Sequence, residues 1–497
     1  MKIAFINPPF FPKYSREQRS PAVTKSGTYY YPMWLSYAAG YAEQQGYEIK
    51  LWDETTTCST NEEILQKIKD YGPGLAVIST STPSIYNDIQ FAEDLKKLLN
   101  NIFILLVGVH VSALPEETLL INDSIDAVAI GEYEKTAVKI AEYIQGKHRI
   151  EEIVSIAYKN HGSVTINDKK DLISNLDEIP WVSRTYNKYL NYKNYFYSGN
   201  LYPLVVFLTS RGCPCKCSFC VYPQVFTGHR VRYRSTEDVV NEMEYVVKTF
   251  SPLGEIMFED DTLTIDKERI MELCEKIIKK RINITWSCNA RVQLDLETMK
   301  IMKRSGCRSL LVGFESGSQD VLDSMRKGNH LRDYEKFMKD TRTAGLLVNA
   351  AFLVGCPGET KETMQNTLDL AKRLNPDVAQ FFPIMIYPGT KMYEDYNNKG
   401  YLNAKNYREW LNKDGLHNCV VDLPGMKANE LVEFCDYCRR KYYLRPNYIF
   451  KKGVQALFSP REGIRTFKAA KTFAKHLFKG TDLKEKTSSW LFPDEDT

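Results

Sequence analysis

Four cysteines crowd into residues 213–220, in the stretch RGCPCKCSFC that follows the apolar run LYPLVVFLTS. Cys213, Cys217 and Cys220 have the spacing CxxxCxxC, and Cys215 lies inside it. A structural zinc site normally takes two CxxC-type pairs separated by a longer loop, and no second pair lies nearby. Three thiolates instead suit a 4Fe-4S cluster in which one iron lacks a protein ligand. The spacing therefore predicts an iron–sulfur cluster with a reactive iron.

Six strand-like runs, each separated from the next by a helical segment, follow one another from Leu204 onward. They are LVVFLTS, EIMFEDD, ITWSCNA, SLLVGFES, LVNAAFLVG and VAQFFPIMIYPGT. Six strand-plus-helix units predict an incomplete parallel barrel of the TIM type, in which active groups lie at the carboxyl ends of the strands. The cysteine cluster follows the first strand, so we expect it at the mouth of this barrel.

A second α/β region precedes the barrel. From Met1 to about Tyr143, five short strand-like runs alternate with helical ones, which predicts an open Rossmann-like parallel sheet. Ligands of such sheets gather beyond the carboxyl ends of the strands, where this chain has small and polar residues. Those residues are suited either to a large polar ligand or to ordinary strand-to-helix turns. The sequence alone leaves both interpretations open.

Length and composition bound the other possibilities. A chain of 497 residues exceeds one ordinary core, so we expect several domains: 1–150 (parallel sheet), 151–200 (hairpin and linker), 201–395 (barrel) and 396–497 (helical region). No apolar run reaches the roughly eighteen residues of a membrane span. Because the start resembles no export signal, the twelve cysteines indicate metal or redox chemistry in a reducing, cytoplasmic compartment.

CxxxCxxC after the first strand of an incomplete barrel resembles the radical S-adenosylmethionine superfamily. With a parallel sheet placed before it, the chain resembles the cobalamin-binding branch, which includes the class B-type methyltransferases. The resemblance implies Cys213, Cys217 and Cys220 as cluster ligands, with S-adenosylmethionine chelating the open iron. Cys215 is then surplus, as a packed or neighbouring thiol. An external electron donor of the flavodoxin or ferredoxin type is also implied.

The same resemblance gives roles to the strand ends of the barrel. FEDDT stands where the family usually has a Gly-Gly-Glu-like stretch for the methionine amino group, and it supplies acids without the glycines. A carboxylate facing an ammonium is physically apt, although each acid alone could be a solvated loop carboxylate. The implied S-adenosylmethionine contacts are Phe219, Glu259, Asp260, Asp261, Asn289, Arg291, Glu315, Ser316, Gly355 and Glu359.

The N-terminal sheet lacks the DxHxxG motif whose histidine ligates cobalt in mutase-type domains. His110, in GVHVSALPEET, follows the fourth strand, and a lone histidine is more often a hydrogen-bonded structural residue. The resemblance therefore implies base-off cobalamin without a histidine ligand. The implied contacts are Asn7, Pro8, Pro9, Ser79, Thr80, Ser81, Gly108, His110, Val111, Ser112, Gly131 and Glu132.

Residues 10–34, here named the aromatic segment, are long for a loop and rich in aromatic side chains. Loops of that length in compact domains are usually functional or disordered. We expect the segment to line a substrate cavity, and the alternative is an aromatic cover over the core. The candidate cavity residues are Tyr29, Tyr30, Tyr31 and Trp34.

The C-terminal region is strongly basic, with twelve Lys and Arg against one acid, Glu462, between residues 439 and 480. Residues 463–480 can form an amphipathic helix, which either rests on anionic lipid at the inner membrane face or docks on its own domain with a solvated basic face. No nucleic acid partner is expected, because no RNA-binding module accompanies this charge. Cys419, Cys435 and Cys438 could ligate an auxiliary cluster, but packing is the commoner fate.

The pattern as a whole predicts an enzyme. By resemblance, it would use the cluster and cobalamin to form a 5′-deoxyadenosyl radical and methylate an unactivated carbon of a small-molecule substrate, such as a lipid or another apolar metabolite. One alternative is radical cyclisation, oxidation, rearrangement or carbon–carbon coupling without net methyl transfer. An alternative of another class is a cluster-binding, membrane-associated interaction protein.

Overall fold

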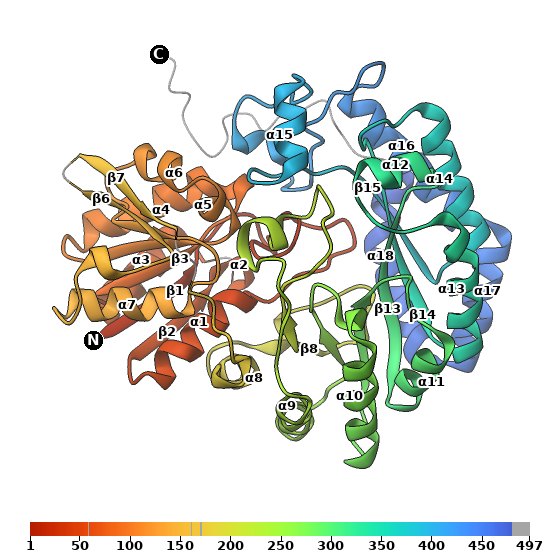
Figure 1. Ribbon diagram of the computed structural model, residues 1–497, viewed down its shortest axis with the longest axis horizontal. Coiled ribbons are helices and arrows are strands. Elements are labelled where there is room, and N and C mark those ends of the chain that lie inside the picture. The colour runs from red at the N-terminus through yellow and green to blue at the C-terminus, as the bar shows by residue number, and fades with distance from the viewer. Residues whose placement is uncertain (58, 161, 169–170, 480–497) are drawn as a thin grey trace.

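The computed structural model describes residues 1–57, 59–160, 162–168 and 171–479. It contains two α/β units side by side, an N-terminal sheet and a partial barrel, with further helices against the barrel's outer side (Figure 1). The expected fold class is confirmed, including the helical C-terminal region as far as Lys479. Residues 480–497 of that region lie outside the described residues.

The N-terminal sheet has the order β2-β1-β3-β4-β5-β6-β7, and its first five strands are parallel. β3 and β4 are apolar runs with almost every residue buried, as expected where helices cover both faces. The strands are β1 (Lys2–Asn7), β2 (Glu48–Asp53), β3 (Leu75–Ser79), β4 (Phe103–Val107), β5 (Ala127–Ala129), β6 (Ile156–Asn160) and β7 (Ser163–Asn167). Their helices are α1 (Met33–Gln44), α2 (Glu54–Thr57), α3 (Asn61–Tyr71), α4 (Ile85–Leu98), α5 (Val109–Ala113), α6 (Pro115–Ile121) and α7 (Glu134–Ile144).

The expected hairpin at 153–168 is present as β6 and β7, although His161 in its turn lies outside the described residues. Contrary to the expected division at residue 150, the hairpin is part of the N-terminal sheet rather than of a linker, because β6 pairs antiparallel with β5. Ala127, Val128 and Ala129 pair with Tyr158, Ala157 and Ile156. The N-terminal unit therefore continues to Asn167.

The barrel sheet has the order β15-β14-β13-β12-β11-β8, all parallel, as expected for six strand-plus-helix units. Its strands are β8 (Leu204–Phe207), β11 (Glu255–Phe258), β12 (Thr285–Ala290), β13 (Cys307–Glu315), β14 (Leu347–Val354) and β15 (Val378–Pro383). A short antiparallel ribbon, β9 (Ser210–Arg211) with β10 (Arg232–Tyr233), follows β8. α8 (Val182–Tyr189) connects the two units.

The barrel helices begin at side-chain caps that satisfy their first backbone N–H groups. Ser235, Asp266, Asp295 and Thr360 accept such bonds at the starts of α9, α10, α11 and α14. The helices are α9 (Thr236–Thr249), α10 (Lys267–Lys279), α11 (Leu296–Arg304), α12 (Gln319–Ser324), α13 (Leu331–Ala344), α14 (Lys361–Leu374), α15 (Lys391–Asn398), α16 (Ala428–Tyr443), α17 (Pro446–Phe458) and α18 (Pro460–Lys479).

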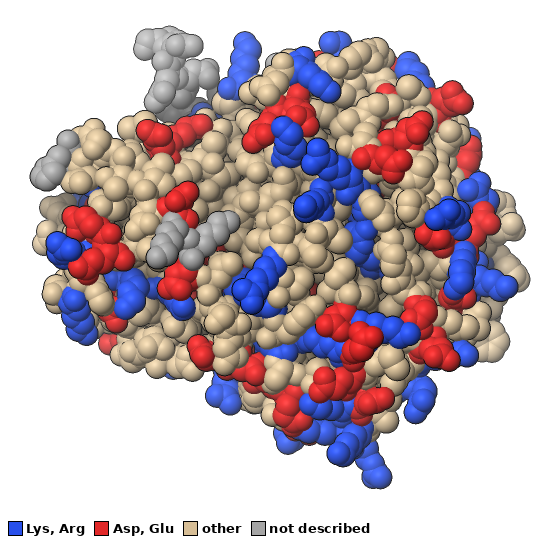
Figure 2. All heavy atoms as spheres, in the orientation of Figure 1, with Lys and Arg blue, Asp and Glu red and all other residues tan. Residues whose placement is uncertain are grey.

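One continuous core joins the two units. It runs from the α1 side of the N-terminal sheet, through the aromatic segment, into the barrel, while a second core lies on the other face of the sheet. On the face shown in Figure 2, positive and negative side chains are interspersed rather than separated into fields of one sign. Among the described residues, none of the helices combines the length and the apolar character needed to cross a membrane.

Candidate active site

The cysteine loop runs from β9 to β10, at the carboxyl end of β8, as expected. The ribbon closes its base, since Arg211 pairs with Arg232 and Ser210 with Tyr233. Cys213 and Cys217 are buried, and Cys215 and Cys220 are partly exposed. The loop is therefore held at both ends, with its thiols between the barrel strands and the surface.

Side chains within the loop fix its backbone. The Gln224 amide nitrogen donates to the carbonyl oxygens of Cys217, Ser218 and Cys220, at 3.2, 3.2 and 2.8 Å. A ring nitrogen of His229 lies 3.0 Å from the Cys213 carbonyl oxygen. Because the loop backbone is bonded internally, its sulfur atoms remain the groups offered to a ligand.

The thiols influence one another electrostatically. Burial raises the pKa of Cys220 to about 12, and Asp261, Cys217 and Cys213 act in the same direction. A hydrogen bond between the thiols of Cys213 and Cys215 lowers the pKa of Cys215 to about 7. Among the described residues, no three or more His, Cys, Asp or Glu side chains are arranged to hold a metal ion. The chemistry of the donor set still fits an iron–sulfur cluster, because three cysteines of one loop influence one another electrostatically, and Cys215 is bonded to one of them, Cys213.

The three acids after β11 have different partners. Asp260 is fully buried, and its carboxylate accepts hydrogen bonds from the Thr209 backbone (2.6 Å), the Thr209 hydroxyl (2.6 Å) and the Ser210 hydroxyl (2.7 Å). It therefore holds the turn between β8 and the cysteine loop. Glu259 and Asp261 instead face the space between the two units.

Arg19 of the aromatic segment reaches across to these two acids. Its guanidinium lies 2.8 Å from a Glu259 oxygen and 3.1 Å from an Asp261 oxygen. The Arg19 side chain is 38% exposed, whereas those of Glu259 and Asp261 are 15% and 9% exposed. The ion pair thus joins the N-terminal unit to the barrel mouth. Sequence analysis missed Arg19, because only packing brings it to residues some 240 positions later.

The next strand ends form a second charged group. Arg291 donates to the Lys327 carbonyl oxygen at 2.6 Å and to Asn329 at 3.0 Å. Lys327 pairs with Glu315 at 2.6 Å and lies 5.9 Å from the centre of the Phe219 ring. Lys327 was not predicted, because it follows a helix in MRKGN without any recognisable motif. Its largely buried ammonium group thus lies near the cysteine loop.

The remaining predicted contacts surround this group. The Asn289 amide donates to the Asp260 carbonyl oxygen at 2.8 Å, and Ser316 is fully buried beside Thr367. Glu359 accepts from the backbone N–H groups of Gly355 and Cys356, at 2.6 and 2.9 Å. Its second oxygen is buried without a hydrogen-bond partner, and burial raises the pKa of Glu359 to about 7.

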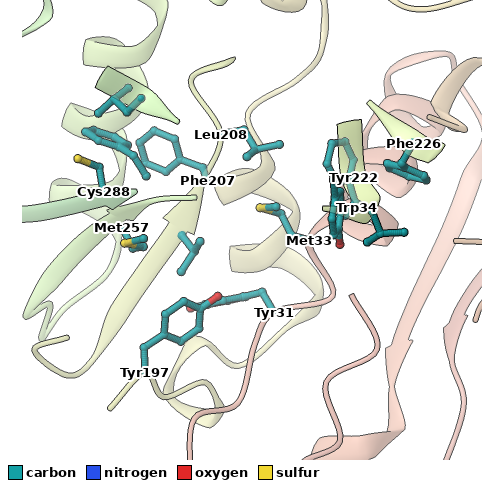
Figure 3. Close-up of a cluster of buried hydrophobic side chains, with 14 of the residues drawn as sticks. Tyr31, Met33, Trp34, Tyr197, Phe207, Leu208, Tyr222, Phe226, Met257 and Cys288 are labelled. Carbon is teal, nitrogen blue, oxygen red and sulfur yellow. The ribbon is translucent and has the colours of Figure 1, made fainter. Parts of the chain in front are cut away.

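A cavity that is partly open to solvent lies between the two units. Figure 3 shows Tyr31, Met33 and Trp34 of the N-terminal unit beside Tyr197, Leu208 and Tyr222 on the barrel side. The polar lining includes residues from the aromatic segment and from the barrel's strand ends. It comprises Glu17, Gln18, Arg19, Ser210, Arg211, Thr227, Glu259 and Asp261.

Three of the four candidate cavity residues, Tyr30, Tyr31 and Trp34, are part of this lining. Tyr29 is not, contrary to expectation. It is buried underneath, where its hydroxyl donates to Asp53 at 2.9 Å and its ring stacks on Tyr195. The aromatic segment thus both covers the core and lines the cavity.

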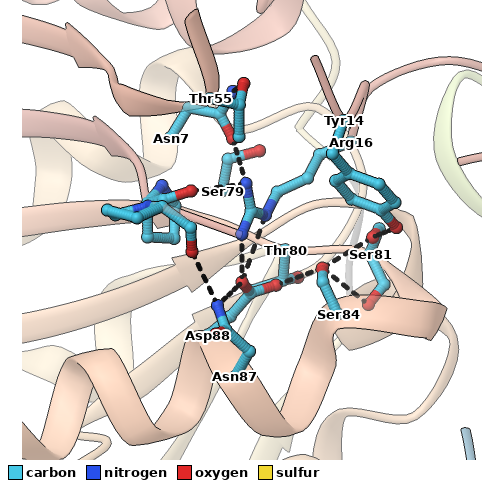
Figure 4. A network of polar contacts seen from close by, with 12 residues as sticks. Asn7, Tyr14, Arg16, Thr55, Ser79, Thr80, Ser81, Ser84, Asn87 and Asp88 are labelled. Carbon is cyan, nitrogen blue, oxygen red and sulfur yellow. Dashed lines mark hydrogen bonds and ion pairs between the residues drawn. The ribbon is translucent and has the colours of Figure 1, made fainter. Parts of the chain in front are cut away.

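Side chains of the aromatic segment also fill the carboxyl ends of the N-terminal strands (Figure 4). Arg16 donates to the Asn7 side chain at 2.8 Å, to the Pro8 carbonyl oxygen at 2.7 Å and to Asp88 at 2.7 Å. Neither Arg16 nor Asp88 has an exposed side chain. The Tyr14 hydroxyl bonds Ser81 at 2.8 Å.

Glu17 continues this network toward the cavity. Its carboxylate accepts from the backbone N–H groups of Trp34 and Leu35 at the start of α1, at 2.7 and 3.2 Å, and from Ser79 at 3.1 Å. Burial raises the pKa of Glu17 to about 7. In this structure the predicted cobalamin contacts Asn7, Pro8, Ser79 and Ser81 therefore bond the chain's own aromatic segment.

Two other predicted cobalamin contacts, His110 and Glu132, also have internal partners, although the Nε2 atom of His110 is buried without a hydrogen bond. His110 is buried, bonds Thr82 at 3.2 Å and packs edge-on against Tyr407, and burial lowers its pKa to about 3. Glu132 forms buried ion pairs with Arg211 and Arg232, the two arginines of the ribbon below the cysteine loop. At Gly108 a Cβ would lie 2.5 Å from the Thr80 carbonyl oxygen, so the backbones meet closely there.

Two sequence families match the chain. Residues 207–371 match the radical SAM superfamily, and residues 19–141 match the B12 binding domain. An uncharacterized methyltransferase of Pyrococcus horikoshii is 30% identical over 91% of this chain and 94% of its own length. The anaerobic magnesium-protoporphyrin IX monomethyl ester cyclase of Rubrivivax gelatinosus is 26% identical over 74% of this chain and 66% of its own length.

The same fold occurs in the solved structure of TsrM from Kitasatospora setae, a radical S-adenosylmethionine methyltransferase with cobalamin and a 4Fe-4S cluster bound. The TM-score is 0.62 at 17% identity, over 81% of this chain and 76% of that chain. At that identity the likeness concerns the fold, and both units are included in it.

Proposed function

The chain belongs to the cobalamin-binding branch of the radical S-adenosylmethionine enzymes, and on that premise we propose that it methylates an unactivated carbon of an apolar substrate. The cavity between the two units is the observation that carries this proposal. It is lined on one side by the aromatic segment and on the other by the strand ends beside the cysteine loop. A substrate placed there would touch both parts of the enzyme.

Cys213, Cys217 and Cys220 would hold the 4Fe-4S cluster. When bound, the cofactors supply the electron that cleaves S-adenosylmethionine and the carrier for a methyl group. The protein's part begins with the loop, which Gln224 and the β9–β10 ribbon keep in place. Lys327 would partly offset the negative charge of the thiolates, because its pKa is affected by Cys217 as well as by Glu315.

S-adenosylmethionine would lie along the barrel's strand ends. Glu259 and Asp261 are the acids available for its ammonium group, whereas Asp260 is fully engaged with Thr209 and Ser210. Glu315 and Arg291 would face its ribose and carboxylate. Glu359 acts indirectly, because its bonds to Gly355 and Cys356 shape the turn where the adenine would lie.

We propose that cobalamin is bound base-off, without a histidine ligand. His110 supports this, because it packs against Tyr407 and its pKa is lowered to about 3. The predicted strand-end contacts bond the aromatic segment in this structure, so no step of the reaction is assigned to them. A readout independent of activity is the electron paramagnetic resonance spectrum of bound cob(II)alamin, which should be unchanged in His110→Ala.

The lining of the cavity favours an apolar substrate, such as a lipid or another apolar metabolite. Tyr30, Tyr31, Met33, Trp34 and Leu208 provide aromatic and aliphatic surface, and apolar surface also excludes water. We propose that this substrate is taken up near a membrane, and that a flavodoxin or ferredoxin type protein donates the electron.

Product analysis tests the methylation. One S-adenosylhomocysteine and one 5′-deoxyadenosine per turnover are expected if a methyl group is transferred. A second candidate is a ring-forming or oxidising reaction without methyl transfer, which the similarity to the Rubrivivax gelatinosus cyclase favours. That reaction would yield 5′-deoxyadenosine without S-adenosylhomocysteine, so the ratio of the two products decides between them.

A further inference from the structure

α18 packs against the barrel through charged side chains, whereas an ordinary surface helix packs through its apolar side chains. Glu462 and Arg465 are 6% and 7% exposed. Glu462 accepts a hydrogen bond from Arg308 at 2.6 Å, and Arg465 donates to the Ser198 carbonyl oxygen at 3.0 Å. Arg308 also bonds the fully buried Glu255 at 3.0 Å. Since Arg308 and Glu255 begin β13 and β11, α18 crosses the amino-terminal end of the barrel, opposite the cysteine loop.

The apolar side of the helix pair is consequently exposed. Among the described residues, seven of the thirteen exposed large apolar side chains fall between positions 444 and 467. They are Leu444 (46%), Ile449 (57%), Phe450 (74%), Leu457 (82%), Phe458 (87%), Ile464 (60%) and Phe467 (71%). Side chains this exposed and this close in sequence indicate an interaction surface rather than scattered apolar residues.

These residues form one surface because α17 and α18 pack against each other. The helices approach closely at Gly463, where a Cβ would lie only 3.1 Å from that of Ala456. Leu457 and Phe458 end α17 just after Ala456, Ile464 directly follows Gly463, and Phe467 lies about one helical turn after Gly463. α17 lies at the outer edge of the barrel, far from the N-terminal sheet (Figure 1).

Basic residues accompany the apolar ones. Arg461, Lys468 and Lys471 are exposed on α18, close in sequence to Ile464 and Phe467, and the Lys468 ammonium lies 5.1 Å from the centre of the Tyr202 ring. The sequence analysis left open whether residues 463–480 rest on lipid or dock on their own domain. As far as Lys471, α18 docks on the barrel through Glu462 and Arg465, and Ile464 and Phe467 remain exposed. The side chains of residues 472–479 lie outside the described residues.

We propose that the α17–α18 hairpin attaches this enzyme to an anionic lipid surface. Apolar side chains would enter the headgroup region while the neighbouring Lys and Arg contact lipid phosphates, the arrangement of interfacial helices. A second copy of the chain fits less well, because a symmetric contact would bring this basic surface against itself. The proposal does not depend on the substrate, since the hairpin lies at the opposite end of the barrel from the cysteine loop.

Vesicle sedimentation of the full chain tests whether the α17–α18 hairpin binds anionic lipid. The protein should pellet with vesicles of equal parts phosphatidylglycerol and phosphatidylcholine, should bind pure phosphatidylcholine weakly, and should be released by salt. Leu457→Ser/Phe458→Ser and, separately, Lys468→Glu/Lys471→Glu should each weaken binding about tenfold or more. Melting curves check that each variant is folded.

Matched controls come from the N-terminal unit. Leu120→Ser replaces an apolar side chain that is 66% exposed, and Lys67→Glu/Lys69→Glu reverses two exposed charges on α3. Both should bind vesicles like the unchanged protein. The proposal is overturned if the full chain ignores anionic vesicles, or if it is a dimer that Leu457→Ser/Phe458→Ser dissociates. It is also overturned if only a chain lacking residues 480–497 binds, because the tail would then cover this surface.

Discussion

The two sets of strand ends in this molecule are built differently. At the barrel mouth, Glu259 and Asp261 line the cavity, and the cysteine loop contributes Tyr222 and Thr227 to the same lining. At the N-terminal sheet, Asn7, Ser79 and Ser81 are bonded to Tyr14, Arg16 and Glu17 of the aromatic segment. The barrel mouth is thus organised for a ligand, whereas the sheet edge is organised by its own chain.

The difference follows from where the polar partners come from. In the barrel, the cysteine loop satisfies its own backbone through Gln224, so the sulfurs need no protein partner. In the sheet, Arg16 brings a buried charge, which Asp88 neutralises and to which Asn7 adds a hydrogen bond. Substitutions in the two regions should accordingly affect different properties: ligand content in the barrel and stability in the sheet.

The largest effect is expected at the cysteine loop. Cys213→Ala, Cys217→Ala and Cys220→Ala should each abolish S-adenosylmethionine cleavage and lower the bound iron and sulfide, because a cluster corner loses its ligand. Cys215→Ala is the matched variant and should retain both. Iron and sulfide analysis of anaerobically purified protein measures this. If Cys215→Ala loses its iron while one of the other three keeps it, the ligand assignment is wrong.

Sequence analysis predicted the barrel well, because the patterns that indicate the barrel lie in short stretches of the sequence. The cysteine spacing, the six strand-plus-helix units and the acids after β11 are all visible within a few consecutive residues. Arg19 and Lys327 could not be found this way, since each reaches its partner only through packing between distant segments. The internal bonding of Asn7 and Ser81 was missed for the same reason. It depends on how residues 10–34 fold back over the sheet.

Breaking the buried pair at the sheet edge should cost stability. Arg16→Met leaves the Asp88 carboxylate buried without its charged partner, a change that typically destabilises by about 3–5 kcal/mol. Arg16→Met/Asp88→Asn should recover part of that loss. Urea unfolding of the full chain measures both. Unchanged stability together with weaker cobalamin binding would contradict the comparison, because the sheet edge would then be a ligand site.

Glu359 is an acid of the barrel mouth whose carboxylate bonds its own backbone turn, so we expect it to affect stability rather than ligand binding. Its pKa is raised to about 7 by burial, so ionisation opposes folding. Stability should fall as pH rises from the unfolded value near 4.5 to about 7, by up to about 3 kcal/mol. Glu359→Gln should make this dependence shallower, and the remainder should include the part that Glu17 contributes through its own raised pKa. Glu362→Gln, at an exposed position of α14, should leave the dependence unchanged. Thermal unfolding between pH 4 and 8 shows the slope, and an unchanged slope in Glu359→Gln would rule out this origin.

The smallest change in stability is expected at Arg19, which connects the two regions. Its ion pairs with Glu259 and Asp261 are partly exposed, so Arg19→Gln should alter stability by less than about 1 kcal/mol. Arg19→Gln nevertheless removes the cation that competes with the ammonium group of S-adenosylmethionine for Glu259 and Asp261, so this variant, loaded with the cluster, should bind S-adenosylmethionine more tightly. Glu259→Gln removes one of the two acids and should bind it more weakly. Lys13→Gln, an exposed change in the same segment, is the control for titration calorimetry. Weaker binding in Arg19→Gln would mean that the aromatic segment contributes directly to the ligand site. The barrel mouth and the edge of the N-terminal sheet would then belong to a single site.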